Sequence, residues 1–512
     1  MSDLKEDYKH DAAHVEVASQ FDDAEIARAK AQHVADTAAD GYVDPTLIIS
    51  PEENNALRKK INRRVLPLLC LAYICQALDK GTLGTASIMG WQADVGAVGQ
   101  DYALTSTFLW IGIIVGEPIA NQLVRRLPLG KLIGIAIIIW SALLLGLAFS
   151  LSIIPVFVIR ALLGFSESVV GPVLLSITVQ WYLKVEQPFV SACWQAMLGA
   201  QSAIGGLLGF GFYHVQKTHG LFGWQWMTIA IALFSFVAGT VILLFLPDSP
   251  TQARWATEDE KVKFVERVRS NNQGIKQKHF RRDQLVEAFT DPYTLVLFGL
   301  AFTQTLVVGG INTFNNLLMN KAFGFTVLQS QLLNIPLGAM TILTYFLITG
   351  LIKRFNQTLL IMMAFTIPNI IGSIVLLTVT PSDKTKGGLV VAFYIMQVFQ
   401  SCNPAIFLML SRNVAGQTKK SILYAVTYIG WAGGNSAAPQ LFQAKWAPRY
   451  LRSLEIHLAL YGCFIIICCL GRMLLVSRNK KKEAAQQGHE PTNMLAFDDL
   501  TDIQNPDFRY CL

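Results

Sequence analysis

Twelve apolar stretches of about 20 residues run through the chain, each long enough for an α-helix to cross roughly 30 Å of bilayer hydrocarbon. With 52% hydrophobic and only 15% charged residues, this pattern excludes an ordinary soluble protein and predicts an all-α polytopic membrane protein. The stretches lie at about 66–88, 103–123, 131–150, 154–178, 190–213, 225–246, 292–314, 328–351, 358–379, 388–410, 420–442 and 455–477.

A charged stretch at 247–290 divides these segments six and six. It predicts two six-helix bundles, at 65–246 and 291–478, joined by a central loop and enclosing a substrate cavity between them. The polar segments 1–64 and 479–512 are expected to be tails, the first of them mostly disordered.

Lysine and arginine set the expected orientation. Near the membrane, about 27 lysines and arginines lie in the segments predicted on the same side of the membrane as the termini. About 7 lie in the loops predicted on the other side. Both termini are therefore predicted to be cytosolic.

Four charged residues interrupt the apolar stretches: Asp79 and Lys80 in the first, and Arg160 and Glu167 in the fourth. Charges are costly in lipid and usually face a cavity or one another. The two bases favour an anion, and the two carboxylates could carry a proton. The alternatives are that Asp79 and Lys80 lie at the membrane surface, or that Arg160 and Glu167 form a structural ion pair with them.

Arg160 and Glu167 are seven residues apart, so they share one helix face at a separation of about 10.5 Å. Gly164 lies between them on that face. Its missing side chain leaves room for a ligand or for a partner helix.

Other polar residues in the apolar stretches allow more than one interpretation. Glu117, beside Pro118, is better explained by packing than by proton transfer. Asn312, Asn315 and Asn316 lie at the outer end of the seventh stretch. Asn312 and Asn315 are candidate substrate ligands, but all three amides could equally cap the helix or face water.

Glycines recur at four-residue spacing, as Gly205 with Gly209 and as Gly430 with Gly434. Small residues let helices approach closely in lipid. Such pairs could form a sliding contact between the bundles or simply pack tightly.

Signatures of catalysis and of nucleotide use are missing from the sequence. Gly130-Lys131 lacks the upstream glycine of a phosphate-binding loop, and no zinc motif or Ser/His/Asp set is present. We therefore expect no ATP-driven transport, no enzyme activity, no metal, no cofactor and no nucleic-acid partner.

Several stretches carry a specific resemblance, from about residue 55 to the C-terminus. They are Leu-Asp-Lys-Gly-Thr-Leu-Gly-Thr-Ala (78–86), Arg-Ala-Leu-Leu-Gly-Phe-Ser-Glu-Ser-Val-Val-Gly-Pro (160–172), Gln-Trp-Tyr (180–182), Leu-Pro-Asp-Ser-Pro (246–250), Arg-Ser-Asn-Asn-Gln-Gly (269–274), Gly-Gly-Ile-Asn-Thr-Phe (309–314) and Phe-Asp-Asp-Leu-Thr-Asp-Ile-Gln-Asn-Pro-Asp-Phe-Arg-Tyr (497–510). The sequence resembles the major facilitator superfamily and, within it, the fungal allantoate permease family of anion:cation symporters. The loop at 121–131 departs from the superfamily pattern because it lacks the acidic residue.

This resemblance implies proton-coupled uptake of a small organic anion by alternating access. Substrates of such relatives include allantoate, ureidosuccinate, nicotinate and pantothenate, and some relatives take dipeptides. Matching by motif implies that Asp79 and Glu167 take the coupling proton, that Lys80 contacts the substrate carboxylate, and that Arg160 pairs with the protonation site and contributes to substrate binding.

The expected partners are an anionic small molecule, a proton and the lipid bilayer, with the protein acting as a monomer in the plasma membrane. Two alternatives share the fold. One is an exporter of a small metabolite or drug, and the other is a transport-inactive nutrient sensor, for which the long tails could serve.

Overall fold

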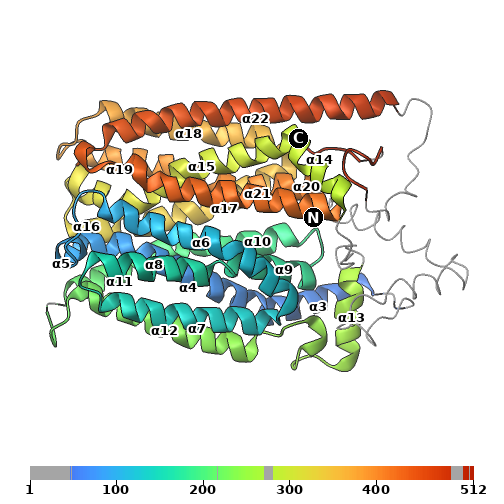
Figure 1. The fold of residues 1–512 in the computed structure, drawn as a ribbon, viewed down its shortest axis with the longest axis horizontal. Helices are drawn as coiled ribbons and strands as arrows, with labels where there is room; N and C mark the ends of the chain where they lie inside the picture. The colour runs from blue at the N-terminus through green and yellow to red at the C-terminus, as the bar shows by residue number, and fades with distance from the viewer. Residues whose placement is uncertain (1–46, 48, 216, 270–280, 486–499, 507) are drawn as a thin grey trace, which may run out of the picture.

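The computed structural model describes residues 47, 49–215, 217–269, 281–485, 500–506 and 508–512. Long helices run side by side along the longest axis of the molecule, and both described chain ends lie at the same end of it (Figure 1). No strand is assigned within these ranges, where the only pairing of that kind is an isolated bridge between Thr218 and Leu221. The all-α prediction is thereby confirmed. Most of the expected N-terminal tail, residues 1–46, lies outside the described part.

Helices α4 to α12 form the first bundle. It consists of α4 (Leu66–Ala86), α6 (Asp101–Arg126), α7 (Leu129–Ala148), α8 (Ile153–Glu167), α9 (Val170–Trp181), α10 (Gln187–Gln195), α11 (Met197–Tyr213) and α12 (Gly223–Phe245), with a short turn η2 (Ser87–Trp91) and α5 (Gln92–Asp94) after α4. Helix α3 (Pro51–Arg64) precedes α4 and begins with a capping box, in which Ser50 and Glu53 exchange hydrogen bonds. The N-terminal segment is therefore helical from Pro51 onward.

Helices α15 to α22 form the second bundle. It consists of α15 (Pro292–Leu317), η4 (Leu318–Ala322), α16 (Val327–Leu332), α17 (Asn334–Phe355), α18 (Thr358–Thr378), α19 (Lys386–Met396), η5 (Gln397–Ser401), α20 (Cys402–Asn413), α21 (Gln417–Ala437), η6 (Ala438–Leu441), η7 (Ala444–Trp446) and α22 (Leu451–Ala485). Between the bundles lie η3 (Pro250–Gln252), α13 (Glu258–Arg269) and α14 (Arg282–Thr290).

Ten helical segments of the described chain are long and apolar enough to cross a membrane, judged by length and composition. The two other predicted spans are helical but fall outside this set. One is divided into α10 and α11 near Ala196, and the other is α21, which starts with the polar run Gln417-Thr418-Lys419-Lys420. Large apolar side chains such as Leu295 and Leu343 are about 70% exposed, at 74% and 69%. Such exposure is expected of a surface that faces lipid.

Helices α6 and α8 approach each other through glycines. A Cβ atom on Gly164 would lie 1.9 Å from the carbonyl oxygen of Leu109, and one on Gly112 would lie 2.0 Å from that of Ala161. The structure therefore decides between the two interpretations of Gly164, because the space beside it is filled by the partner helix α6.

The glycine pairs at four-residue spacing behave differently from one another. Gly430 and Gly434 pack against Phe298 and Phe302 of α15, which belongs to the same bundle. Tight packing is therefore the role that the structure gives this pair. Gly209 contacts Gln331 of the opposite bundle, whereas the nearest atom to a Cβ on Gly205 would be in Gln201 of its own helix.

The two bundles approach each other closely at Gly199 of α11 and Gly338 of α17. A Cβ on either glycine would lie within 2.4 Å of the carbonyl oxygen of the other. Toward the end of the molecule that carries α5 and α16, opposite the described termini (Figure 1), hydrogen bonds join the bundles. Tyr102 donates to the Thr313 carbonyl at 2.5 Å, and Thr107 donates to the Ser436 carbonyl at 2.8 Å.

Candidate substrate and proton site

The four embedded charges come together between α4 and α8. Asp79, Arg160 and Glu167 are almost fully buried, with exposures of 0%, 2% and 1%. The ammonium of Lys80 lies 3.2 Å from a carboxylate oxygen of Glu167, and the Lys80 side chain remains 23% exposed. Three of the four charges are therefore enclosed by the protein rather than exposed on its surface. Lys80 is the member of the cluster that is open to a ligand.

Each charge in this cluster is influenced by the others. Asp79 interacts electrostatically with Glu167, Arg160 and Lys80, and Arg160 interacts with both carboxylates and with Tyr102. Two acids and two bases balance formally. Buried charges are tolerated when they are paired, but removing one member leaves its partner uncompensated. The charge state of one carboxyl group therefore affects the whole cluster.

Hydrogen bonding in the cluster is incomplete. Within the described part of the chain, Nε of Arg160 has no hydrogen-bond partner, whereas Glu167 is paired with Lys80 at 3.2 Å and interacts with Asp79. Buried polar groups are normally satisfied, and exceptions commonly mark functional sites. A proton on a carboxylate, or a polar ligand beside Lys80, would reduce this cost.

Aromatic residues extend the site toward the second bundle. The Lys80 ammonium lies 5.2 Å from the ring centre of Trp110 in α6, within the range of a cation–π contact. Trp110 meets the edge of Trp431 at 4.9 Å, and Trp431 lies 5.0 Å from Tyr428, both on α21. Sequence reasoning missed these rings because tryptophan and tyrosine in an apolar stretch look like ordinary core residues.

Glu117 lies near the same aromatic residues. Asn121, one turn away on α6, donates to a carboxylate oxygen of Glu117 at 3.3 Å. Glu117 also interacts with Tyr428 of the second bundle. This contact between bundles was not anticipated, because only packing beside Pro118 could be inferred locally.

The structure places the candidate asparagines elsewhere. Asn312 is exposed on α15, and Asn315 donates to the Asn334 side chain at 2.7 Å. Asn334 in turn donates to Asn316 at 2.8 Å, and Asn316 reaches Thr85 of the first bundle at 3.5 Å. Among the described residues, no contact joins Asn312 or Asn315 to the four charges.

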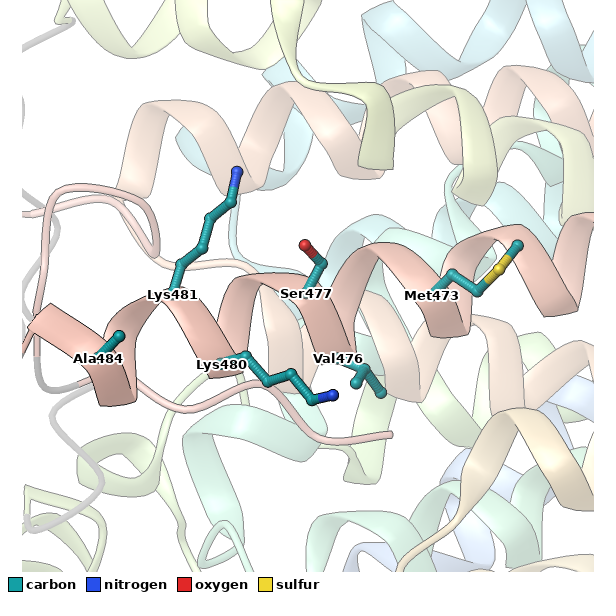
Figure 2. A pocket seen from close by; sticks show the side chains of 6 residues that line it. All are labelled: Met473, Val476, Ser477, Lys480, Lys481 and Ala484. Atoms are coloured by element: carbon teal, nitrogen blue, oxygen red, sulfur yellow. The ribbon is translucent and has the colours of Figure 1, made fainter.

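An open groove of about 490 Å³ follows the outer face of α22, lined by Met473, Val476, Ser477, Lys480, Lys481 and Ala484 (Figure 2). It contains none of the four charged residues, so it is separate from the candidate site. No group of three or more His, Cys, Asp or Glu side chains in the described ranges is placed to hold a metal ion.

Membrane-length helices in two bundles, with a cluster of buried charges between α4 and α8, define a multi-pass protein of the secondary-transporter class. Residues 69–439 match the family model of the Major Facilitator Superfamily. The chain belongs to this superfamily.

Individual relatives support the same conclusion. The chain is 30% identical to the allantoate permease of Saccharomyces cerevisiae over 91% of this chain and 88% of that protein. It is 31% identical to the thiamine pathway transporter THI73 of the same yeast, over 90% of this chain and 87% of that one. Both relatives are transporters rather than enzymes.

A solved structure shares the fold at low identity. The crystal structure of a D-xylose-proton symporter aligns with a TM-score of 0.59 and 13% identity, over 80% of this chain and 96% of that one. This similarity supports the bundle architecture alone.

Proposed function

We propose that the protein is a proton-coupled symporter that takes up a small organic anion by alternating access. The observation that carries the proposal is the contact between Lys80 and Glu167, in which a partly accessible base is held by a buried acid. A carboxylate substrate of the allantoate, ureidosuccinate, nicotinate or pantothenate type would compete with Glu167 for Lys80. The similarity to an allantoate permease supports this substrate class.

Proton binding supplies the coupling in this scheme. A proton taken up by Glu167 from an acidic exterior neutralises the carboxylate, so Lys80 is released to bind the substrate carboxylate. Asp79 and Arg160 share the proton site because their charges act on Glu167. The higher cytosolic pH then removes the proton, and Glu167 displaces the substrate from Lys80.

The available driving force is adequate for accumulation. One pH unit across the membrane provides about 1.4 kcal/mol per proton, and 100 mV provides about 2.3 kcal/mol per net charge moved. A plasma-membrane location with both termini cytosolic follows from the same scheme, and the lysine and arginine distribution favours that orientation.

Uptake in reconstituted vesicles with a defined pH gradient tests this proposal. Small carboxylates are screened at acidic and neutral external pH, and the accumulated substrate is then followed in Glu167→Gln. We expect this variant to lose the substrate accumulation that the pH gradient drives, while still allowing substrate to move down its own concentration gradient. Glu455→Gln, at an exposed position on α22, is the matched control.

Two results would contradict the proposal. Undiminished pH-driven accumulation by Glu167→Gln would remove the coupling role of this carboxylate. If substrate moved only in the direction opposite to the inward flow of protons, the protein would instead be an exporter.

A further inference from the structure

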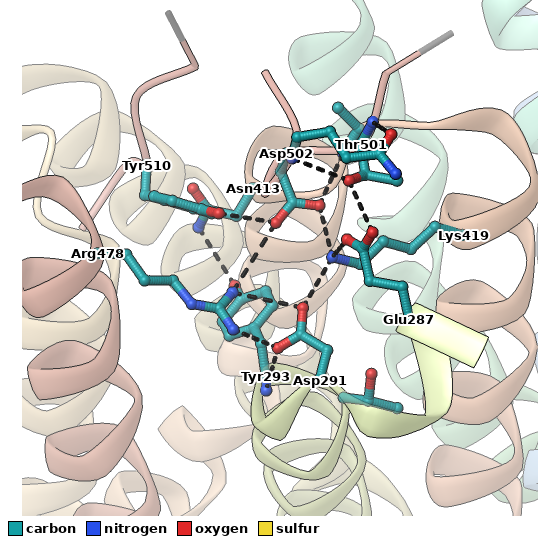
Figure 3. Close-up of polar contacts among 12 residues, drawn as sticks. Glu287, Asp291, Tyr293, Asn413, Lys419, Arg478, Thr501, Asp502 and Tyr510 are labelled. Carbon is teal, nitrogen blue, oxygen red and sulfur yellow. Dashed lines mark hydrogen bonds and ion pairs between the residues drawn. The ribbon is translucent and has the colours of Figure 1, made fainter. Parts of the chain in front are cut away.

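Residues 500–506 and 508–512 form a docked peptide, although they follow a polar segment that resembles an ordinary tail. The peptide lies against the ends of α14, α15, α20, α21 and α22 (Figure 3). Thr501 and Asp502 have 0% exposure and Tyr510 has 4%. Burial of this degree for three polar side chains requires a matching set of partners.

Lys419 is the centre of that set. Its fully buried ammonium lies 2.9 Å from Glu287, 2.8 Å from Asp291 and 2.8 Å from Asp502. An ammonium group has three donors, and here three carboxylates surround it. Two of them come from the bundle and its preceding helix, and the third comes from the peptide. Thr501 extends the contact by donating to Glu287 at 2.9 Å.

Arg478 of α22 connects the same carboxylates from the other side. It lies 2.5 Å from Asp291 and 3.8 Å from Asp502. Although burial alone would raise the pKa of Asp291, the hydrogen bond from Arg478 and the charge of Lys419 outweigh it and hold that pKa below its usual 3.8. Asp291 is thus a permanent anion between two cations. Asp502 supplies a further negative charge.

The site also binds the backbone of the peptide. Asn479 donates to the Tyr510 carbonyl and accepts from the Tyr510 amide, both at 2.9 Å. Asn413 does the same for Cys511, at 3.0 and 2.7 Å. Lys482 donates to the carbonyl oxygens of Asp502 and Asn505 at 2.5 and 2.6 Å. Paired bonds of this kind recognise an extended chain, as an added strand would.

Tyr510 fixes the register of the peptide. Its hydroxyl donates to Asp502 at 2.8 Å, and its ring centre lies 5.6 Å from the Arg478 guanidinium and 5.3 Å from the Lys482 ammonium. Phe508 adds a second ring, whose centre lies 5.5 Å from the Lys482 ammonium. The peptide therefore presents one acid and two aromatic rings to a site with three cations.

We propose that the ends of α14, α15, α20, α21 and α22 form a peptide-binding site for an acidic, tyrosine-containing segment, and that its occupant is Leu500–Leu512 of this chain. The bound peptide ties the ends of α15, α21 and α22 into one unit. Its release loosens the second bundle and lowers transport, a consequence that rests on the proposed function.

Labelling of Cys511 in the full-length protein tests the site without reference to transport. A membrane-impermeant maleimide is applied to protein in nanodiscs, and peptide mass spectrometry quantifies labelling of Cys511. In Asp502→Asn we expect labelling to be roughly tenfold faster, because a buried charged hydrogen bond is lost. Asp383→Asn, whose side chain is 97% exposed, is the matched control. Equal rates in both variants and in the unaltered protein would overturn the proposal.

A second measurement asks whether the site binds the peptide in trans. The full-length Asp502→Asn protein, whose attached peptide is held less tightly, is combined with a fluorescent peptide of residues 500–512 or with its Asp502→Asn version. We expect saturable binding of the first peptide, at least tenfold weaker binding of the second, and little binding of either to the unaltered protein. Equal binding of the two peptides would contradict the assignment of Asp502.

Transport separates the two parts of the proposal. Faster Cys511 labelling with unchanged uptake in Asp502→Asn would support the peptide site and overturn its effect on transport. Because labelling and peptide binding need no substrate, failure of the proposed transport function would leave both results interpretable.

Discussion

The Lys80 ammonium and a carboxylate oxygen of Glu167 lie 3.2 Å apart, although 87 positions separate the two residues in the chain. The Glu167 side chain is more deeply buried than that of Lys80. Glu167 is enclosed, whereas Lys80 is accessible and rests beside Trp110. In the proposed transport cycle, a substrate carboxylate would therefore contact Lys80 before it could reach Glu167. This order of access relates substrate binding to the protonation of Glu167.

Replacement of Lys80 by methionine should destabilise the protein more than replacement of both residues. Lys80→Met leaves Glu167 buried without its base, at a cost of roughly 3 kcal/mol, whereas Lys80→Met with Glu167→Gln removes both charges. Thermal unfolding in detergent should show a large drop for the single variant and a partial recovery for the double variant. Additive losses would argue against coupling of the pair.

Trp110→Leu should weaken substrate binding without preventing folding. The contact between the ring and the ammonium is worth about 1 kcal/mol, so we expect KM for uptake to rise roughly fivefold with little change in Tm. Trp226→Leu, in α12 and hydrogen-bonded to the Thr218 carbonyl, is a control outside the cluster. An equal rise in KM for both variants would indicate a general packing effect.

Gly338→Ala should impair transport by separating the bundles, because its Cβ would lie 2.2 Å from the Gly199 carbonyl oxygen. Gly350→Ala is the matched control on the same helix, since a Cβ there meets nothing within 4 Å. The control should be neutral or slightly stabilising, as alanine is favoured over glycine in helices. Initial uptake rates and Tm are compared between the two variants. Equal uptake rates would show that the bundles can move apart at this contact without loss of transport.

Glu117→Gln should keep proton-coupled accumulation, in contrast to Glu167→Gln. The amide preserves the size of the side chain and can still bond to Asn121 and Tyr428, which contact it in the structure. We expect uptake at each pH to stay within about twofold of the unaltered protein. Loss of pH-driven uptake would instead place Glu117 in the proton path.

The embedded charges could be predicted as a cluster because the cost of isolated charges in lipid leaves few other arrangements. The length of the membrane helices followed from hydropathy because an α-helix needs about 20 apolar residues to cross the bilayer, and ten spans of that kind are found in the described part of the chain. The partners of Gly164 and Gly209 could not be predicted, since a small residue indicates close approach but not which helix approaches. Trp110 and Trp431 were missed because their role depends on the distance to Lys80, which composition does not encode.

The docked peptide shows a different limit of the sequence. Asp502, Lys419 and Arg478 are polar and distant in the chain, and each alone is typical of a solvated surface. Periodicity identifies faces that bury apolar groups, but it does not identify which charges pair. The docking of residues 500–506 and 508–512 therefore depended on tertiary contacts that the sequence pattern does not reveal.

At the end opposite the described termini, the hydrogen bonds that join the bundles among the described residues connect uncharged groups, including Tyr102 with Thr313, Thr107 with Ser436, and Gln331 with the Thr85 carbonyl. Neutral hydrogen bonds are exchanged for bonds to water at small net free energy and without desolvation of ions. Each of these bonds is consequently insensitive to the ionic strength of the surrounding solution, so a change of salinity leaves them unaltered.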